Sequence, residues 1–435
     1  MSFPFEQYTA VIENSDPVRV NGRVTQVVGL LVEATGPQIP VGEVCHITTG
    51  LGPMPCEVVG FRRNSILLMP LVSTAGIRQG SEVVPFGQPL TAPAGEALLG
   101  RLVDGLGVPI DEKGDLPPDI GRVPISRDPP NPFSRRRINA PLETGIKVLD
   151  AMLTMGRGQR MGIFSGSGVG KSTLMGMICR SSKADVNVIG LVGERGREVR
   201  EFIEKDLGPE GLRRSVVVVA TSDKPALVRV KAAFTATAIA EYFRDQGKDV
   251  MLMMDSVTRF ALSQREIGLA VGEPPTTRGY TPSVFSLLPK LLERAGTSKT
   301  GSITAIYTVL VEGGDMDEPV ADAVRGILDG HLVLSREMAH QNLFPAVDIL
   351  GSISRLMPDI VSKKHYDTAG RVRDLYSTYQ QSADLVNIGA YKKGTNAKID
   401  QAVERLPRIE AFIKQGIQEA VPFEESVRLL EGILA

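Results

Sequence analysis

Residues Gly162–Ile178 read GIFSGSGVGKSTLMGMI, an apolar run joined to a helix-like segment by small residues and a single lysine. A strand, a loop of small residues and a helix are typical of a phosphate-binding loop, because successive backbone N–H groups can close around phosphate oxygens at the positive end of the helix. Gly170, Lys171 and Ser172 fit the pattern G-x-x-x-x-G-K-[ST], and Ser165, also small, stands at its first glycine. The predicted nucleotide-binding residues are Gly166, Ser167, Gly168, Val169, Gly170, Lys171, Ser172 and Thr173.

Apolar runs alternate with segments long enough for helices on both sides of this loop. The runs are RMGIFSG, VNVIGLVG, SVVVVATS, DVMLMMDS and SITAIYTVLVE, all within residues 141–358. Such alternation predicts a mostly parallel sheet covered on both faces by helices, with ligands at the carboxyl ends of the strands. We therefore expect an α/β P-loop core over residues 141–358.

Smaller regions flank the expected core. Residues 18–90 hold short runs of valine, isoleucine and leucine broken by glycine and proline, which favours a small β-barrel. Residues 91–140 are rich in proline and glycine and predict an extended connector and entry to the core, in which Arg135–Arg137 is interpreted as a solvated face. In residues 359–435 apolar side chains recur at intervals of three and four, which predicts a C-terminal helical domain.

Composition narrows the class of protein. The 435 residues include 49 basic and 50 acidic side chains, a formal charge of −1, so no global charge favours a nucleic-acid partner. Cys45, Cys56 and Cys179 lack metal-ligand spacing and cannot all pair, which favours buried thiols in a reducing cytoplasm. With no signal peptide and no run of eighteen apolar residues, we expect a soluble protein.

Hydrolysis of a bound triphosphate needs a metal, a group that orients water and charge stabilisers near the γ-phosphate. Asp255 ends the run DVMLMMDS, where its carboxylate can hold Mg²⁺ through water while the Ser172 hydroxyl binds the ion directly. Glu194 follows the run VNVIGLVG and could polarise the attacking water, although its charged neighbours equally favour a solvated loop. Phe344 could stack on a base and Arg355 could reach a phosphate; a core aromatic and a surface arginine are the alternatives.

Five longer stretches together resemble a family of hexameric ATPases related to the catalytic subunit of rotary ATP synthases, and within it the ATPase of flagellar and type III protein export. They read GIKVLDAMLTMGRGQRMGIFSGSGVGKST, GLVGERGREVREFI, VMLMMDSVTRFALSQREIGLAVGEPPTTRGYTPSVFSLLPKLLERAG, SITAIYTVLVEGGDMDEPVAD and ILDGHLVLSREMAHQNLFPAVDILGSISRLM. The resemblance runs from about Val18 to near the C-terminus and implies a RecA-like core.

The resemblance also implies roles for single residues. Lys171 would contact the β- and γ-phosphates of ATP, Ser172 the Mg²⁺ ion, and Asp255 the water shell of that ion. Glu194 would act on the attacking water, supported by Arg195. Arg355 would be an arginine finger for the ATP of a neighbouring subunit. Phe344 would lie against adenine, although this chain reads Asn342-Leu343-Phe344 where the family usually has Gly-His-Tyr.

The same resemblance implies partners and a location. It implies a homohexamer that energises flagellar protein export at the cytoplasmic face of the inner membrane. Its partners would be regulatory or stator-like proteins, stalk-like proteins, chaperone–substrate complexes and the membrane export gate, with no nucleic acid. The segment Met1–Pro17, with Phe3, Phe5 and Tyr8, is either an arm that docks a regulatory partner or a disordered end.

Four alternative functions stay open at this point. A virulence-type export ATPase would share every catalytic element. A rotary ATPase subunit would have a longer C-terminal domain with an acidic contact loop. An RNA translocase like the terminator Rho would need aromatic and basic clusters in its barrel, which this near-neutral chain lacks. A non-catalytic nucleotide-binding subunit would usually carry an amide in place of the Glu194 carboxylate.

Overall fold

The structure is a computed structural model that describes Thr9 and residues 20–435. Apart from Thr9, the predicted arm Met1–Pro17 lies outside the described residues. The chain divides into two compact units, Met1–Leu90 and Thr91–Ala435. No helix in the described part of the chain is long and apolar enough to cross a membrane.

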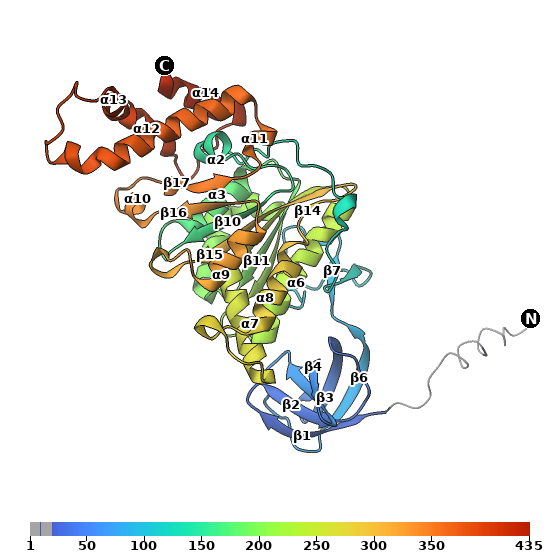
Figure 1. The fold of residues 1–435 in the computed structure, drawn as a ribbon. Helices are drawn as coiled ribbons and strands as arrows, with labels where there is room; N and C mark the ends of the chain where they lie inside the picture. The colour runs from blue at the N-terminus through green and yellow to red at the C-terminus, as the bar shows by residue number, and fades with distance from the viewer. Residues whose placement is uncertain (1–8, 10–19) are drawn as a thin grey trace, which may run out of the picture. The chain divides into compact units, whose positions relative to one another are not determined.

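The described residues of the first unit form a closed β-barrel (Figure 1). Its antiparallel strands follow the order β1-β2-β5-β4-β3-β6, and β6 pairs back onto β1. Val32, Ile47 and Leu68 fill its interior, and the free thiols of Cys45 and Cys56 are buried there, which confirms the barrel and the buried thiols. The strands are β1 (Gly22–Val28), β2 (Leu31–Thr35), β3 (Glu43–Thr49), β4 (Gly52–Arg62), β5 (Ser65–Pro70) and β6 (Glu82–Pro89).

A sheet in the order β17-β16-β10-β15-β13-β11-β12-β8 forms the centre of the second unit. All neighbouring strands along this path run parallel except β16 and β17, and β14 pairs antiparallel with β15. This arrangement confirms the α/β core. Its strands are β8 (Leu102–Asp104), β10 (Arg160–Ser165), β11 (Val186–Val192), β12 (Ser215–Ala220), β13 (Asp249–Asp255), β14 (Gly296–Thr297), β15 (Ser302–Leu310), β16 (Gly330–Leu334) and β17 (Val347–Ser354).

Helices cover both faces of this sheet because its strands are apolar on both sides (Figure 1). Met251 and Met253 of β13 join one hydrophobic cluster with Leu174 of α3, whereas α6 packs on β11, β12 and β13 from the opposite face. The helices of the core are α2 (Lys147–Met152), α3 (Lys171–Ser181), α4 (Gly196–Glu201), α5 (Gly208–Arg213), α6 (Ala226–Asp245), α7 (Val257–Val271), α8 (Pro282–Leu292), α9 (Pro319–Ile327), α10 (Arg336–His340) and α11 (Met357–Ile360). Short helical turns are η1 (Glu96–Leu98), η2 (Pro132–Ser134), η3 (Phe202–Leu207), η4 (Thr277–Gly279) and η5 (Glu312–Gly314), of which η3 is a π-helix.

Three helices at the C-terminus confirm the predicted helical region. They are α12 (Lys363–Asn387), α13 (Ala397–Ile413) and α14 (Phe423–Leu434). Helices α13 and α14 pack on α12, and α14 also packs on α2 of the core. Near the start of α12 the buried His365 ring bonds the Ala151 carbonyl of α2 at 2.7 Å. The C-terminal helices are therefore joined to the core by packing and by hydrogen bonds.

The proline-rich passage after the barrel is more structured than its composition indicates. Strand β7 (Thr91–Ala94) pairs with β9 (Gly121–Pro124), and β8 adds an edge strand beside β12. The interpretation of Arg135–Arg137 as a solvated face is wrong for Arg135. That side chain is half-buried and donates to the carbonyls of Glu293 and Ala295, which lie beyond the last turn of α8 and need donors. Arg136 is exposed but bonds the Ser298 carbonyl at 3.1 Å.

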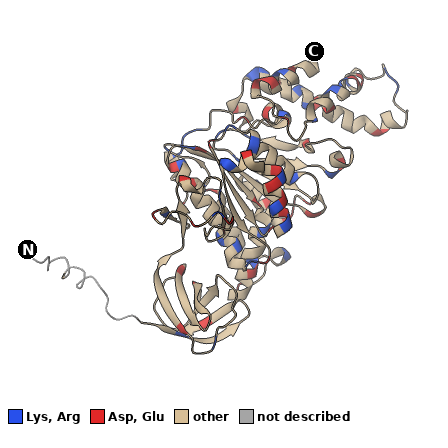
Figure 2. Cartoon of the chain, turned by 180° about the vertical axis from the view of Figure 1, so that it is seen from behind, with Lys and Arg blue, Asp and Glu red and all other residues tan. Residues whose placement is uncertain are grey.

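Charge is mixed over the second unit. Figure 2 shows basic and acidic residues interspersed along its helices, in keeping with the formal charge of −1.

Candidate nucleotide-binding and catalytic site

The glycine-rich loop joins the carboxyl end of β10 to the first turn of α3. Gly170 immediately precedes α3 with φ 94°, a left-handed conformation that glycine adopts without the steric cost of a side chain. No side chain caps this helix start, so its first backbone N–H groups are left to an external acceptor. Those free donors at the positive end of a helix make the loop an anion-binding site.

A hollow of about 460 Å³ opens beside this loop. It is bordered by the loop, by the segment after β11 and by the end of β13. Most of the sequence-predicted residues therefore meet in one place. The residues lining it are Gly166, Ser167, Gly168, Gly170, Lys171, Ser172, Thr173, Leu191, Glu194, Arg195, Arg197, Glu198, Val199, Glu201, Phe202, Asp255, Arg259 and Leu310.

Two acidic side chains and one lysine converge in the hollow. The Lys171 ammonium lies 2.5 Å from Asp255 Oδ1 and 3.9 Å from Glu194 Oε1. Asp255 is buried at the end of β13, where its Oδ1 also accepts from the Thr308 hydroxyl at 2.6 Å. The parallel sheet explains the convergence, because β10, β11 and β13 all end at the same edge.

Glu194 is buried rather than solvated, so the solvated-loop interpretation of this residue is wrong. Burial, the nearby Asp255 charge and a hydrogen bond shared with Glu198 raise the pKa of Glu194 to about 7, against the opposing effect of Lys171 and Arg259. The shared bond lowers the pKa of Glu198. A carboxyl group with a pKa near neutrality can hold or release a proton under ordinary conditions.

Arg259 is a site residue that sequence reasoning missed. Its Nε donates to Glu194 Oε1 at 3.1 Å, from the first turn of α7. That helix starts directly after Asp255, and the Ser256 hydroxyl accepts from the Arg259 N–H. Gly193 allows the approach, since a β-carbon there would meet the Arg259 side chain at 3.0 Å. The available signal was an arginine four residues after Asp255, at the start of a helix.

Phe344 also lies beside the phosphate loop, although it is not among the residues that line the hollow. Its ring carbons lie 3.5 Å from where a β-carbon of Gly170 would stand. The side chain is 38% exposed, whereas the neighbouring Leu343 is buried, so the core-aromatic alternative is wrong for Phe344. The structure thus places an accessible aromatic ring beside the loop.

The two arginines predicted from sequence, Arg195 and Arg355, lie in different surroundings. Arg195 lines the rim of the hollow with 73% of its side chain exposed, and it pairs with Glu198 at 3.8 Å. Arg355 follows β17 and is exposed, and its Nη2 donates to the Arg325 carbonyl at 3.4 Å. It is not among the residues that line the hollow. The structure therefore does not bring Arg355 to the phosphate loop of its own chain.

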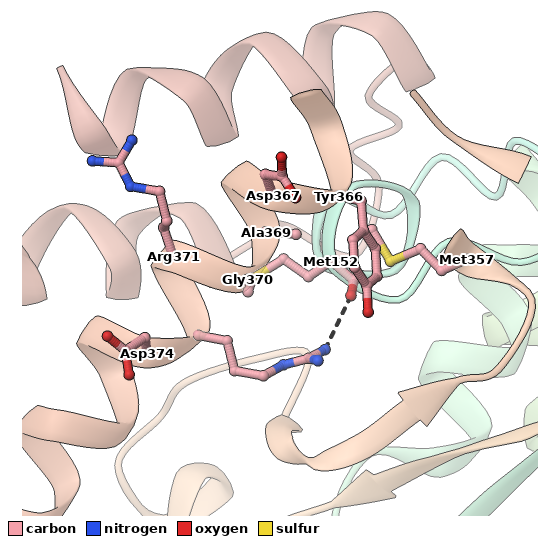
Figure 3. Close-up of a pocket in the computed structure, with 9 residues that line it drawn as sticks. Met152, Met357, Tyr366, Asp367, Ala369, Gly370, Arg371 and Asp374 are labelled. Atoms are coloured by element: carbon pink, nitrogen blue, oxygen red, sulfur yellow. Dashed lines mark hydrogen bonds between the residues drawn. The ribbon is translucent and has the colours of Figure 1, made fainter. Parts of the chain in front are cut away.

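A second hollow of about 470 Å³ lies where α2, α11 and α12 meet (Figure 3). It is bordered by Met152, Met357, Tyr366 and Asp374, and by Arg373, whose Nη2 donates to the Met152 carbonyl at 3.2 Å. This hollow has no glycine-rich loop in its wall, and the first turn of α12 that borders it is already capped, because the Ser362 hydroxyl accepts from the His365 N–H. The free N–H donors that a phosphate chain requires are at the first hollow.

The acidic residues of the first hollow suit a magnesium ion that a nucleotide brings with it. In the described part of the chain, no group of three or more His, Cys, Asp or Glu side chains could hold a metal ion alone. Asp255 and the Ser172 hydroxyl both border the hollow. Mg²⁺ usually binds through one or two protein oxygens, water and substrate phosphates, so this sparse oxygen set fits it.

Fold and site together define a P-loop nucleotide-binding protein with a β-barrel before the core and helices after it. Family models match in the same order: the ATP synthase alpha/beta family β-barrel domain at residues 24–87, its nucleotide-binding domain at 145–354, and the T3SS EscN ATPase C-terminal domain at 361–432.

Known proteins resemble the chain over nearly its full length. A flagellum-specific ATP synthase of Bacillus subtilis is 56% identical over 97% of both chains. A type 3 secretion system ATPase of Xanthomonas euvesicatoria is 51% identical over 95% of this chain and 93% of its own. The assembled ATPase EscN of the enteropathogenic E. coli type III secretion system superposes with a TM-score of 0.91 and 44% identity, over 95% of this chain and all of that one. The chain belongs to the family of flagellum-specific and type III secretion ATPases, and it is an ATPase.

Proposed function

We propose that this ATPase hydrolyses Mg-ATP in the hollow beside the phosphate loop and thereby energises flagellar protein export. The observation that carries the proposal is the convergence of Lys171, Asp255 and Glu194 at the start of α3. A triphosphate bound there would draw the Lys171 ammonium to its β- and γ-phosphates. Asp255 would then be free to hold water of the magnesium shell, and Ser172 would bind the ion directly.

Magnesium, when bound, supplies positive charge that stabilises the transferring phosphoryl group. The chain's own residues supply the remaining parts. Glu194 accepts hydrogen bonds through its carboxylate and orients the attacking water, while Arg259 fixes the position of that carboxylate from α7. Arg195 adds positive charge at the rim, and Phe344 offers a ring face to the base.

The site is completed by a second copy of the chain in this proposal. Arg355 lies away from the hollow of its own chain and is exposed, as an arginine that serves a neighbour must be. EscN was solved as an assembled ATPase and also in complex with its central stalk EscO, which supports a ring of copies that meets a stalk-like partner. We propose a homohexamer, the state in which six identical interfaces close on themselves.

Flagellar export is preferred over virulence-type secretion because two relatives that carry the flagellar name are 56% and 52% identical to this chain, whereas the type 3 secretion system ATPase of Xanthomonas euvesicatoria is 51% identical. Stator-like regulators, chaperone–substrate complexes and the export gate remain proposed partners at the cytoplasmic face of the inner membrane. The catalytic parts are shared by both systems, so the chemistry proposed here does not depend on that choice.

The decisive experiment measures ATP hydrolysis and assembly together. Phosphate release with Mg-ATP is followed for the wild-type chain, Lys171→Ala and the control Lys205→Ala, whose lysine is exposed outside the hollow. Loss of activity in Lys171→Ala alone supports the site. Native mass measurement with a non-hydrolysable ATP analogue should find six copies. A chain that stays single and does not hydrolyse ATP under any assembly condition contradicts the proposal.

A further inference from the structure

A buried glutamine ties the segment after α13 to a residue that lies beside the phosphate loop. Gln415 lies two residues beyond the end of α13 and is 7% exposed. Its backbone N–H donates to the Phe344 carbonyl at 2.9 Å. Because the Phe344 ring lies against Gly170 of the phosphate loop, this bond joins the segment after α13 to an aromatic residue beside that loop.

The Gln415 side chain is fully engaged. Its Oε1 accepts from the Lys147 backbone N–H at 2.8 Å, at the first residue of α2. Its Nε2 donates to the carbonyls of Gly145 at 2.7 Å and Glu419 at 2.9 Å. One amide thus bridges α2, the loop before it and the segment after α13. A buried amide with all its partners in place fixes its surroundings, since each broken bond leaves a polar group unsatisfied.

The same segment is also fixed to the helix that carries the phosphate loop. Arg180, in the last turn of α3, donates through Nη2 to the Ile417 carbonyl at 2.7 Å. Lys147 Nζ donates to the Lys414 carbonyl at 2.7 Å, and the Val421 N–H donates to the Gly145 carbonyl at 3.0 Å. Residues 414–421 are therefore held between α2, α3 and Phe344, with Gln415 as the one buried polar side chain among them.

We propose that Gln415 is a positioning residue for nucleotide binding: it holds Phe344 against the phosphate loop and so makes base affinity depend on the C-terminal segment. This inference rests on the proposed function, in which Phe344 meets the base. Without the Gln415 bonds, residues 414–421 loosen and Phe344 loses its fixed position. The affinity for the base then falls, because the surface that binds it is no longer preorganised. The Lys171 contacts to phosphate persist.

Gln415→Met tests the inference, because it keeps the length of the side chain and removes all three side-chain bonds. The KM for ATP should rise about tenfold, the effect of one or two lost hydrogen bonds. The value of kcat should stay within about twofold, as expected when ground-state and transition-state binding are lost equally. Inorganic tripolyphosphate, which has no base, should inhibit both proteins equally. Gln418→Met is the matched control, since Gln418 is exposed in the same segment.

The Phe344→Leu background separates positioning from general stability. If Gln415 acts through Phe344, adding Gln415→Met to Phe344→Leu should raise KM little further. Fully additive effects, an unchanged KM in Gln415→Met, or equal losses for ATP and tripolyphosphate would each overturn the inference. Should Gln415→Met not fold, Gln415→Glu carries the test, because it keeps the acceptor for Lys147 and loses both donors. A wild-type chain without ATP hydrolysis would instead overturn the proposed function.

Discussion

Glu194 and Asp255 face the same lysine but differ in environment. Asp255 accepts hydrogen bonds from both Lys171 and Thr308, whereas Glu194 accepts from Arg259 and lies farther from the Lys171 ammonium. Two carboxyl groups whose surroundings differ in this way can take different roles in one site. The raised pKa of Glu194 suits a group that acts on the attacking water. The position of Asp255 beside Lys171 suits a group that holds the water shell of the magnesium ion.

Glu194→Gln should bind ATP normally but turn over about 100- to 1,000-fold more slowly, the usual cost of removing one group that acts in the transition state. The amide keeps the size of the side chain and loses its ability to accept a proton. Nucleotide binding by equilibrium fluorescence and single-turnover hydrolysis measure the two effects separately. Glu201→Gln, at the rim of the same hollow, is the control and should retain activity. Near-normal turnover in Glu194→Gln would remove this residue from its role.

The raised pKa of Glu194 predicts a pH dependence of kcat/KM, which reports ionisation of the free enzyme. The active form is the carboxylate, and it is populated above a pKa of about 7. Activity should therefore fall as the pH drops below about 7, approaching tenfold per pH unit for a single group. The profile is measured by initial rates across the pH range at low ATP. A flat profile below neutrality would contradict this assignment.

Residues at strand ends could be predicted from sequence, whereas residues that act across long separations could not. Lys171, Glu194 and Asp255 each follow an apolar run, so a parallel sheet places them at one edge. Arg259 acts through the direction of its side chain from α7, which a pattern of residue types does not indicate. Gln415 meets its partners 268 and 270 positions away, and a polar residue after a helix carries no signal of burial.

At the scale of elements, long apolar runs predicted the five strands β10, β11, β12, β13 and β15, and three-to-four spacing predicted a helical C-terminal region. Strand β8 was not predicted, since Leu102–Asp104 is short and is flanked by glycine and proline. It joins the sheet by pairing with β12, more than 100 residues later. Such an edge strand is specified by its partner rather than by its own composition.

A buried ion pair joins α6 to the residues after α8. Arg294 and Glu241 are each 1% exposed, and Arg294 also donates to the Ile125 carbonyl at 2.6 Å. Arg294→Ala should cost about 3–5 kcal/mol in the free energy of unfolding, because the buried Glu241 carboxylate loses both hydrogen bonds from Arg294 and keeps the ion pair with Arg127 at 3.7 Å. Urea denaturation measures the loss. The control Arg200→Ala breaks an exposed pair with Glu204 and should leave the free energy of unfolding nearly unchanged.

At the scale of the whole molecule, the composition of each region was sufficient to predict a barrel, a core and a helical end in that order. The arrangement of copies was implied by resemblance alone. Arg355 illustrates the reason. Only the structure shows that this residue lies away from the hollow of its own chain, as a residue that serves a neighbouring copy would. A sequence gives no signal that separates a finger for a neighbour from an ordinary surface arginine.

Mixing two inactive variants tests the shared site. Arg355→Ala and Lys171→Ala should each be inactive alone, because each lacks one half of every interface. Rings that contain both should regain part of the activity, since some interfaces then pair an intact phosphate loop with an intact Arg355. Phosphate release is measured after the mixed composition of the rings has been verified by mass. Absence of any recovery in such rings would argue against a site shared between copies.

The closed barrel has a consequence for assembly. Because β1 pairs with both β2 and β6, the described strands of the barrel leave no open edge to which another chain could add its own backbone. Adhesion through these described strands must use side chains, and Val27, Val28 and Phe61 are among the apolar ones on their surface. Surface adhesion of that kind can be undone and remade without unfolding, so individual subunits could be exchanged while the barrel itself stays intact.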